Sequence, residues 1–255
     1  MISPSLKERF ESFMSSGDFA ESVDAAAKLH YPKGFHRADY FARNRTAIIE
    51  QKSLDQDVDA KVRVFLGDLI RVHGPLDRDH ITLAGIIAAV TELPHGNPFK
   101  PRLRAILTQR IDDLLANGDK QTRDTRRFFG LPEAIGVVVI LNEHATLIEP
   151  DYFQDKAWHM LRKEVSPGEL RYPQNQVVIL ISEAHRVVTN ANVEMIPVET
   201  TFSDAGVNNP AVEAFAEELR QRWADFNRAM AGEWLGPGAR WRTRPWDGKG
   251  PGGRS

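Results

Sequence analysis

The chain has 255 residues, 42% hydrophobic and 27% charged, which is enough for one large globular domain with a normal core. It contains no cysteine, which excludes disulfides, thiolate metal sites and a cysteine nucleophile. A net charge of −2 disfavours binding of polyanions over the whole surface, although a local basic groove can still attract a nucleic acid. No apolar run approaches the roughly 20 residues of a membrane helix, and charged residues interrupt positions 1–13, so we expect a cytoplasmic protein without a secretory signal or a membrane partner.

The first fifty residues predict two helices and a β-hairpin. Helical patterns cover residues 5–15 and 19–30, with Asp18 as the N-cap of the second helix. Residues 35–53 then predict two strands around a polar turn.

The middle of the chain predicts helices. Hydrophobic residues recur with helical spacing twice within residues 57–100 and again at 101–117, where Asn117-Gly118 predicts the end of the helix. A basic segment at 119–129 predicts one more short helix.

Two short apolar runs rich in β-branched residues, 135–141 and 177–181, predict buried strands. The helical pattern at 151–164 lies between them, which predicts a βαβ unit. Residues 193–198 predict a weaker strand that Pro197 limits to an edge or a strand end.

A last helical stripe extends from Val212 to Met230, and residues 236–255 are rich in glycine, proline and arginine. We expect those residues to form a flexible basic tail. Residues 1–235 are therefore predicted to form one α/β domain with a mixed central β-sheet of four or five strands flanked by helices.

The predicted hairpin brings charged residues together. If its turn centres on Asn44-Arg45, Asp39 faces Glu50, and paired side chains share a face with Cβ atoms about 4.5–5.5 Å apart. Lys52 follows Glu50 by two residues, so it lies on that face as well. Two carboxylates and an ammonium group are therefore expected on one patch of the sheet.

Two carboxylates about 5 Å apart repel each other by roughly 3 kcal/mol at an effective dielectric constant near 20. A hard divalent cation removes this repulsion, and Mg²⁺ is typically held by one or two carboxylates with water and substrate phosphate. Such an ion lowers the pKa of its bound water, and a nearby lysine stabilises charge in the transition state. The pattern therefore predicts a Mg²⁺ or Mn²⁺ site for phosphodiester hydrolysis.

Asp39, a ten-residue gap and Glu50-Gln51-Lys52 resemble the signature of the PD-(D/E)XK nuclease superfamily, which has the restriction-endonuclease-like fold. There the aspartate lies on one strand and the E-x-K on the next, after an N-terminal helix. The resemblance implies that Asp39 and Glu50 bind the metal, that the Gln51 backbone carbonyl is a further ligand, and that Lys52 is the catalytic lysine.

Many members of the superfamily add a carboxylate from the first helix. Glu21 is the candidate here, with Glu11 behind it. This chain departs from the usual pattern at two positions: Ala38 replaces the proline before the aspartate, and Gln51 replaces the more usual apolar residue.

More than eighty residues separate the E-x-K strand from the next predicted strand, whereas the simple family core has one crossover helix there. The resemblance therefore implies a helical insertion at about 57–100. The helix at 101–117 would be the crossover, from which Gln109 or Gln121 could reach the site.

Two non-catalytic interpretations remain open beside the nuclease hypothesis. An Asp–Glu–Lys cluster can be an ordinary surface salt bridge, and a catalytically inactive nuclease fold can serve as a binding module for nucleic acid or protein. The nuclease hypothesis implies nucleic acid, in the first place DNA, as the partner, and it leaves a homodimer or a partner protein open. The basic residues Arg123, Arg126 and Arg127 are interpreted as a solvated helix face.

Overall fold

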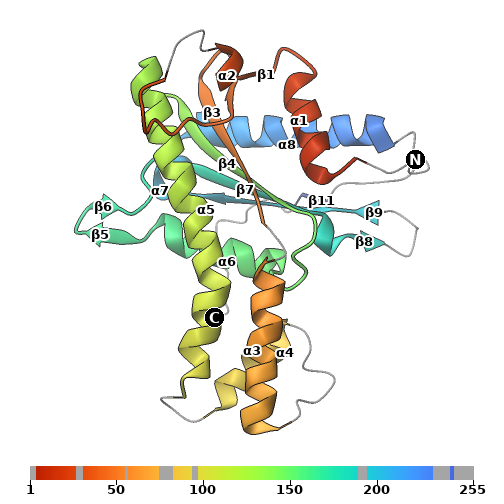
Figure 1. Ribbon diagram of the computed structural model, residues 1–255. Coiled ribbons are helices and arrows are strands. Elements are labelled where there is room, and N and C mark those ends of the chain that lie inside the picture. Colours follow the sequence, from red (N-terminus) through yellow and green to blue (C-terminus); the bar gives the residue numbers. More distant parts are fainter. Residues whose placement is uncertain are drawn as a thin grey trace.

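A mixed β-sheet with helices on both faces forms the centre of the protein (Figure 1), which confirms the α/β class predicted from the sequence. This computed structural model describes residues 4–26, 31–54, 57–74, 83–93, 97–188, 194–231 and 242–243.

The central sheet has the strand order β1-β2-β3-β4-β7-β10-β11. The first three strands are antiparallel neighbours, β3, β4 and β7 are parallel, and β10 is antiparallel to β7 and parallel to β11. The strands are β1 (Ala20–Ser22), β2 (Tyr40–Ala42), β3 (Ala47–Ser53), β4 (Ile135–Asn142), β7 (Val177–Ser182), β10 (Pro197–Phe202) and β11 (Arg242–Thr243). Two short hairpins lie outside this sheet: β5 (Glu164–Ser166) with β6 (Glu169–Leu170), and β8 (Val187–Val188) with β9 (Glu194–Met195).

Helices cover both faces of the sheet. The core on one face contains residues of α1 and α8, and the core on the other face contains residues of α3, α4, α5 and α6. The helices are α1 (Leu6–Ser15), α2 (Val23–Ala26), α3 (Asp57–His73), α4 (Leu83–Glu92), α5 (Phe99–Phe129), α6 (Pro150–Leu161), α7 (Asp204–Val207) and α8 (Pro210–Ala231), with a 3₁₀ turn at Glu183–His185.

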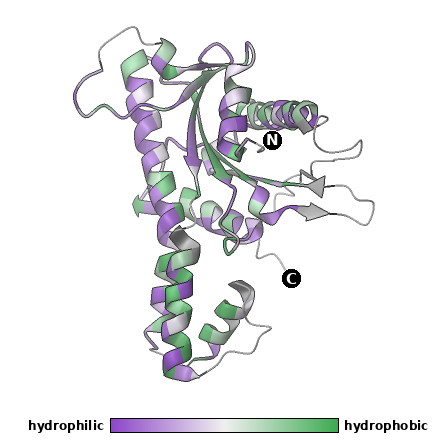
Figure 2. Ribbon diagram, turned by 45° about the vertical axis from the view of Figure 1, so that its right-hand side comes forward, coloured by the Kyte–Doolittle hydropathy of each residue, from purple (hydrophilic) through white to green (hydrophobic). Residues whose placement is uncertain are grey.

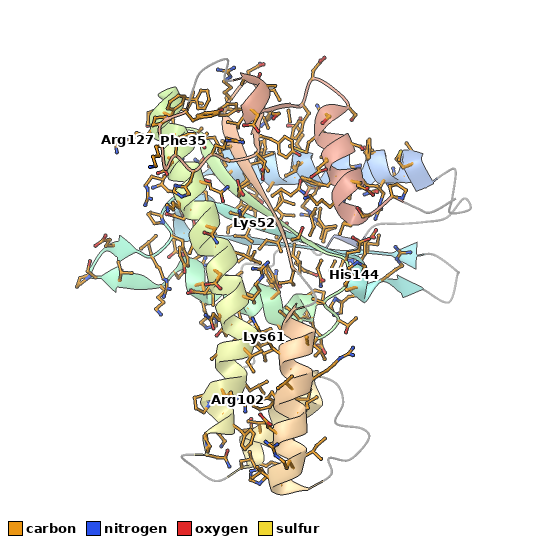
Figure 3. All side chains as sticks on the ribbon, viewed as in Figure 1. Phe35, Lys52, Lys61, Arg102, Arg127 and His144 are labelled. Atoms are coloured by element: carbon orange, nitrogen blue, oxygen red, sulfur yellow. The ribbon has the colours of Figure 1, made fainter. Side chains whose placement is uncertain are left out.

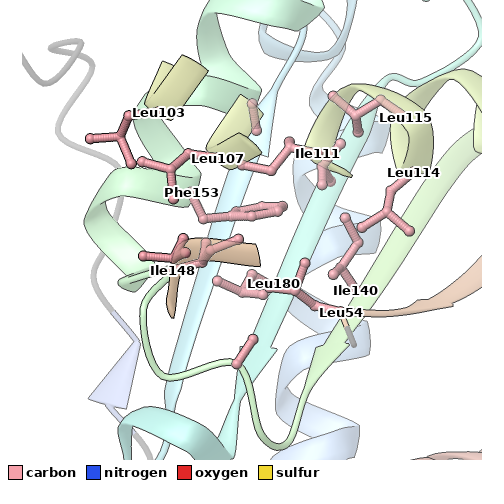
Figure 4. Close-up of a cluster of buried hydrophobic side chains, with 14 of the residues drawn as sticks. Leu54, Leu103, Leu107, Ile111, Leu114, Leu115, Ile140, Ile148, Phe153 and Leu180 are labelled. Carbon is pink, nitrogen blue, oxygen red and sulfur yellow. The ribbon is translucent and has the colours of Figure 1, made fainter. Parts of the chain in front are cut away.

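Successive residues of the central strands serve two different cores, because side chains alternate between the faces of a strand. Val137 and Val139 of β4 pack on the face of α1 and α8, whereas Val138 and Ile140 pack on the face of α5. Figure 4 shows Ile140 in the second core, beside leucines of α5.

The strands β4 and β7 are buried along their whole length. Their continuous apolar sequence suits this position, since covered parallel strands have no solvent-facing side. They are parallel neighbours connected by α6, so the predicted βαβ unit is confirmed. Figure 2 shows the hydrophobic colouring of the central strands between helices that are hydrophilic on their outer faces.

The two helical patterns within 57–100 correspond to α3 and α4. Figure 1 shows both helices, with the first half of α5, projecting from the end of the sheet. Within the described part of this range there is no strand.

The helix expected at 19–30 is wrong. Residues Ala20–Ser22 form β1, only Val23–Ala26 are helical, and residues 27–30 lie outside the described part of the chain. Pairing of β1 with β2 along the sheet edge decides this conformation, since tertiary contacts override the weak helix propensity of so short a segment. Asp18 therefore precedes a strand and caps no helix.

The helix end predicted at Asn117-Gly118 and the separate helix at 119–129 are also wrong, because α5 is one continuous helix of 31 residues. Gly118 serves packing: a Cβ atom at this position would lie 2.6 Å from Val138 Cγ2, so the glycine lets α5 approach β4 closely. The helix ends instead at Gly130, whose φ of 66° is in the left-handed region.

The sheet has more strands than the four or five expected. One reason is β1, and another is β11, which lies within the predicted tail and pairs with Pro197 and Val198. The remainder of 236–255 lies outside the described residues. The weak strand expected at 193–198 is divided between β9 and β10.

None of the described helices combines the length and apolarity needed to cross a bilayer.

Candidate metal centre and its surroundings

The register of the β2–β3 hairpin decides which side chains meet. Tyr40 pairs with Ile49 and Ala42 with Ala47, which is the register expected for a turn at Asn44-Arg45. The Asp39 N–H also donates to the Ile49 carbonyl oxygen at 3.2 Å, so Asp39 stays bonded to β3 but shares Ile49 with Tyr40 and does not extend the regular ladder to Glu50.

The turn of this hairpin is held in an unusual backbone conformation. Arg43, Asn44 and Arg45 all have positive φ values, of 48°, 54° and 67°, a region that favours glycine and asparagine. Two backbone hydrogen bonds hold the turn: Thr46 N–H donates to the Arg43 carbonyl at 3.2 Å, and Arg43 N–H donates to the Phe19 carbonyl at 3.0 Å. These contacts keep the register that sets the site at the other end of the hairpin.

Asp39, Glu50 and Lys52 meet on one face of the sheet. The carboxyl groups of Asp39 and Glu50 are near enough for the charge of Asp39 to raise the pKa of Glu50. Lys52 Nζ lies 2.5 Å from Glu50 Oε1, and it donates to Gln121 Oε1 at 2.6 Å. The Gln51 N–H donates to Asp39 Oδ2 at 2.7 Å. The structure therefore brings together the three residues that the hairpin pattern predicted.

The two carboxylates repel each other unless a cation neutralises the second negative charge. Glu50 is only 1% exposed, and its Oε2 has no hydrogen-bond donor among the described residues. Burial and the nearby charge of Asp39 raise the pKa of Glu50 to about 8, although Lys52 opposes the shift. Burial also raises the pKa of Asp39, against the lowering effects of the Gln51 N–H and of Lys52.

The helix α5 covers this part of the sheet and fixes the chain before Asp39. Gln121 is shared, because its Oε1 accepts from Lys52 and its Nε2 donates to the Arg37 carbonyl at 2.8 Å. One turn further along the helix, Thr125 Oγ1 accepts from the Ala38 N–H at 2.9 Å. Both residues lie on one side of the helix, since they are four positions apart.

Of the two glutamines proposed to reach the site, Gln121 does so, while Gln109 is exposed and makes no contact with the site. The sequence reasoning missed Thr125. Its signal was the spacing: polar side chains at i and i+4 lie on the helix face that turns toward the sheet. Thr125 itself is completely buried.

Glu21 is not part of the site, which corrects the prediction of a third acidic ligand there. It lies on β1 opposite Phe41, its side chain is 47% exposed, and it accepts a hydrogen bond from Arg45 Nε at 2.6 Å. The reserve candidate Glu11 lies on α1, where its carboxylate is 3.7 Å from Lys7 Nζ. The physical reason for the position of Glu21 is that it lies in the edge strand β1. The ladder pairs it with Phe41, two residues along β2 from Asp39.

The donor set fits a hard divalent cation in part. Two facing carboxylates and an orphaned buried oxygen, Glu50 Oε2, are what such an ion would satisfy. The N–H and C=O of one strand residue point to the same side, so the Gln51 carbonyl also faces the Asp39 side. Within the described parts of the chain, however, no group of three or more histidine, aspartate or glutamate side chains could hold a metal.

Comparisons with protein-family models, with curated proteins and with solved structures found no match to this chain.

Proposed function

We propose that this protein is a nuclease that hydrolyses phosphodiester bonds of nucleic acid, in the first place DNA, with Mg²⁺ or Mn²⁺. One observation carries the proposal: the carboxyl groups of partly buried Asp39 and buried Glu50 lie close together, and Glu50 Oε2 has no hydrogen-bond partner among the described residues. Keeping two carboxylates there costs free energy unless a cation or a proton is shared between them. The restriction-endonuclease-like fold belongs to the same proposal, and it is supported by the position of Asp39 directly before β2 and of the E-x-K residues on β3, the next strand of the hairpin.

In this proposal Asp39 and Glu50 hold the ion, with the Gln51 backbone carbonyl as a further ligand. Once bound there, such an ion would supply a water of lowered pKa and would neutralise charge on the phosphate. Gln121 and Glu50 fix the Lys52 ammonium at one point, so it can donate to a phosphate oxygen that gains charge as water attacks phosphorus. The attacking water would release one proton to solvent as its oxygen bonds to phosphorus, and the leaving oxygen would take up one proton from solvent as the far P–O bond breaks.

A non-catalytic nucleic-acid-binding module is the second candidate. The absence of a third metal-binding side chain beside the pair, within the described residues, favours it. Lys52 would then act only as the counterion of Glu50.

Cleavage assays separate the two candidates. Full-length protein is incubated with plasmid DNA, linear single-stranded DNA and RNA, in Mg²⁺, Mn²⁺ or EDTA. We expect cleavage that requires the metal and is lost in Asp39→Asn, Glu50→Gln and Lys52→Ala. Glu21→Gln is the matched carboxylate control, and it should cleave like the wild type because Glu21 pairs with Arg45 away from the site. Absence of cleavage by the wild type in all three substrates would reject the nuclease.

A further inference from the structure

The segment 31–37 lies along the last two turns of α5 and is fixed there by aromatic side chains. The rings of Tyr31 and Phe35 stack with centroids 4.8 Å apart and an interplanar angle of 10°. Phe128 of α5 packs against both rings, at 5.4 Å from Tyr31 and 4.9 Å from Phe35. Because the three rings pack against one another, they hold this segment in place on the helix.

Polar contacts join the same segment to the helix and to the metal centre. His36 Nδ1 lies 3.2 Å from Asp124 Oδ2, and the Arg37 carbonyl accepts from Gln121 Nε2. Gln121 also accepts from Lys52. The segment is therefore connected to the catalytic lysine through a single side chain, and it ends two residues before Asp39.

Exposed cations gather where the segment meets the helix, and we call this the basic surface. Lys120, Arg123 and Arg127 share the outward face of α5, since they are three and four positions apart. Figure 3 labels Arg127 and Phe35 at the same end of α5. The basic surface consists of Lys33, His36, Arg37, Lys120, Arg123 and Arg127, all of them exposed.

The charge of the basic surface opposes that of the whole chain. Its five lysine and arginine side chains face three carboxylates, Asp24 beside Arg37 and both Asp119 and Asp124 beside Arg123, which leaves two positive charges. The complete chain has a net charge of −2. Within the described residues, Lys33, Lys120 and Arg127 form no ion pair, so their charges are available to a polyanion.

Arg126 is excluded from this surface although it belongs to the same run of arginines. Its guanidinium donates to the Ala134 carbonyl and to the side-chain oxygens of Gln174 and Gln176. It therefore ties the end of α5 to the starts of β4 and β7. The run of three arginines therefore divides into one partly buried anchor, Arg126, and two exposed cations, Arg123 and Arg127.

We propose that the basic surface binds a single nucleic-acid strand and leads its phosphates to the Asp39–Glu50 pair. This inference rests on the proposed function for the site to which the strand is led. Lys120 and Arg127 are about 10 Å apart along α5 at 1.5 Å per residue, a length that a few phosphates of one strand can follow.

The recessed position of the carboxylates favours a single strand over a duplex. Glu50 is 1% exposed and the Lys52 side chain is 20% exposed, so the nucleic-acid backbone must bend toward the protein for a phosphate to reach them. A duplex holds its phosphates on the outside of a rod with a persistence length of about 50 nm, whereas a single strand bends at each nucleotide. Single-strand-binding proteins use such positively charged tracks along the backbone.

Binding in EDTA, where no metal-dependent cleavage occurs, tests the inference. The probes are a labelled 20-nucleotide oligo(dT), a 20-base-pair duplex and polyglutamate, each titrated with full-length protein at several salt concentrations. We expect oligo(dT) to bind most tightly. The double variant Lys120→Ala/Arg127→Ala should bind it about 20-fold more weakly at 0.1 M salt, with a salt slope smaller by about 1.4, because each lost phosphate contact contributes about 0.7.

Lys163→Ala/Arg228→Ala is the matched control, since it removes the same charge from exposed positions beyond α6 and on α8. It should bind oligo(dT) like the wild type. Equal loss in both double variants, no loss in either, tighter binding of the duplex, or equal binding of polyglutamate overturns the inference. A protein that binds in this pattern but never cleaves rejects only the proposed nuclease, and one that cleaves while Lys120→Ala/Arg127→Ala binds normally rejects only the basic surface.

Discussion

Lys52 Nζ and Glu50 Oε1 lie 2.5 Å apart, so the ammonium of the E-x-K pattern is the counterion of its own carboxylate in the metal-free protein. The side chains are two residues apart on one strand and project from the same face. Lys52 compensates one carboxylate, while Asp39 adds a second negative charge beside it. The stability of the site should therefore depend on metal, on pH and on the neighbours that hold Lys52.

The first prediction concerns stabilisation by metal. An ion held by the assembled pair binds the folded state, so at 100 times its dissociation constant it should stabilise the wild type by about 2.7 kcal/mol. Asp39→Asn and Glu50→Gln should lose this effect. Thermal melts with and without Mg²⁺ or Mn²⁺ measure it, with Glu21→Gln as the carboxylate control. An identical response of all four proteins would show that the pair binds no metal.

Lys52→Ala should separate binding from chemistry. Its ammonium is proposed to act in the transition state, so the variant should keep much of the metal-induced stabilisation and lose cleavage. The same melts, run beside a cleavage assay, test both parts. Retained cleavage in Lys52→Ala would contradict the role assigned to this lysine.

Stability of the metal-free protein should fall as pH rises. The pKa of Glu50 is raised from 4.5 to about 8, so the folded state binds more protons than the unfolded state between these values. The stabilising contribution is complete below pH 4.5 and is lost as pH rises to about 8, by at most about 1.4 kcal/mol for each pH unit. Denaturant unfolding of wild type and Glu50→Gln in EDTA measures this slope, which the variant should lack. A wild-type slope of opposite sign would disprove the assignment.

Gln121→Ala should loosen the site, because it removes the acceptor of Lys52 and the donor to the Arg37 carbonyl. We expect a loss of about 1 kcal/mol in unfolding free energy and a lower kcat, with metal-induced stabilisation retained. Gln109→Ala, on the same helix but exposed, is the control and should change neither quantity. If both variants behave alike, Gln121 does not position Lys52.

Gly118→Ala should destabilise the protein although alanine favours helices. The new Cβ would lie 2.6 Å from Val138 Cγ2 in the core, and overpacking of this kind costs about 1–3 kcal/mol. Gly67→Ala on α3 is the control: its Cβ meets nothing within 4 Å, so it should stabilise by about 0.5–1 kcal/mol. Chemical denaturation of both variants checks the opposite signs.

Local pattern was sufficient for the central strands β4 and β7 and for the centre of the site. The apolar β-branched runs of β4 and β7 are long enough to be strands and too short for helices, and they lie in the sheet where expected. The approach of Asp39 to Glu50 was expected from the turn position and from the two-residue period of a strand, and the register from Ala42–Ala47 to Tyr40–Ile49 brings the two residues to the same end of the hairpin.

The tertiary structure alone decided which other residues join the pair. Edge pairing converts the segment of Glu21 from an expected helix to a strand, and that strand holds its carboxylate against Arg45. Close packing on Val138 carries α5 through Gly118, and only a continuous helix places Gln121 over Lys52. Pairing and packing between segments distant in sequence are long-range effects, so the local periodicity that identified the hairpin contains no information about them.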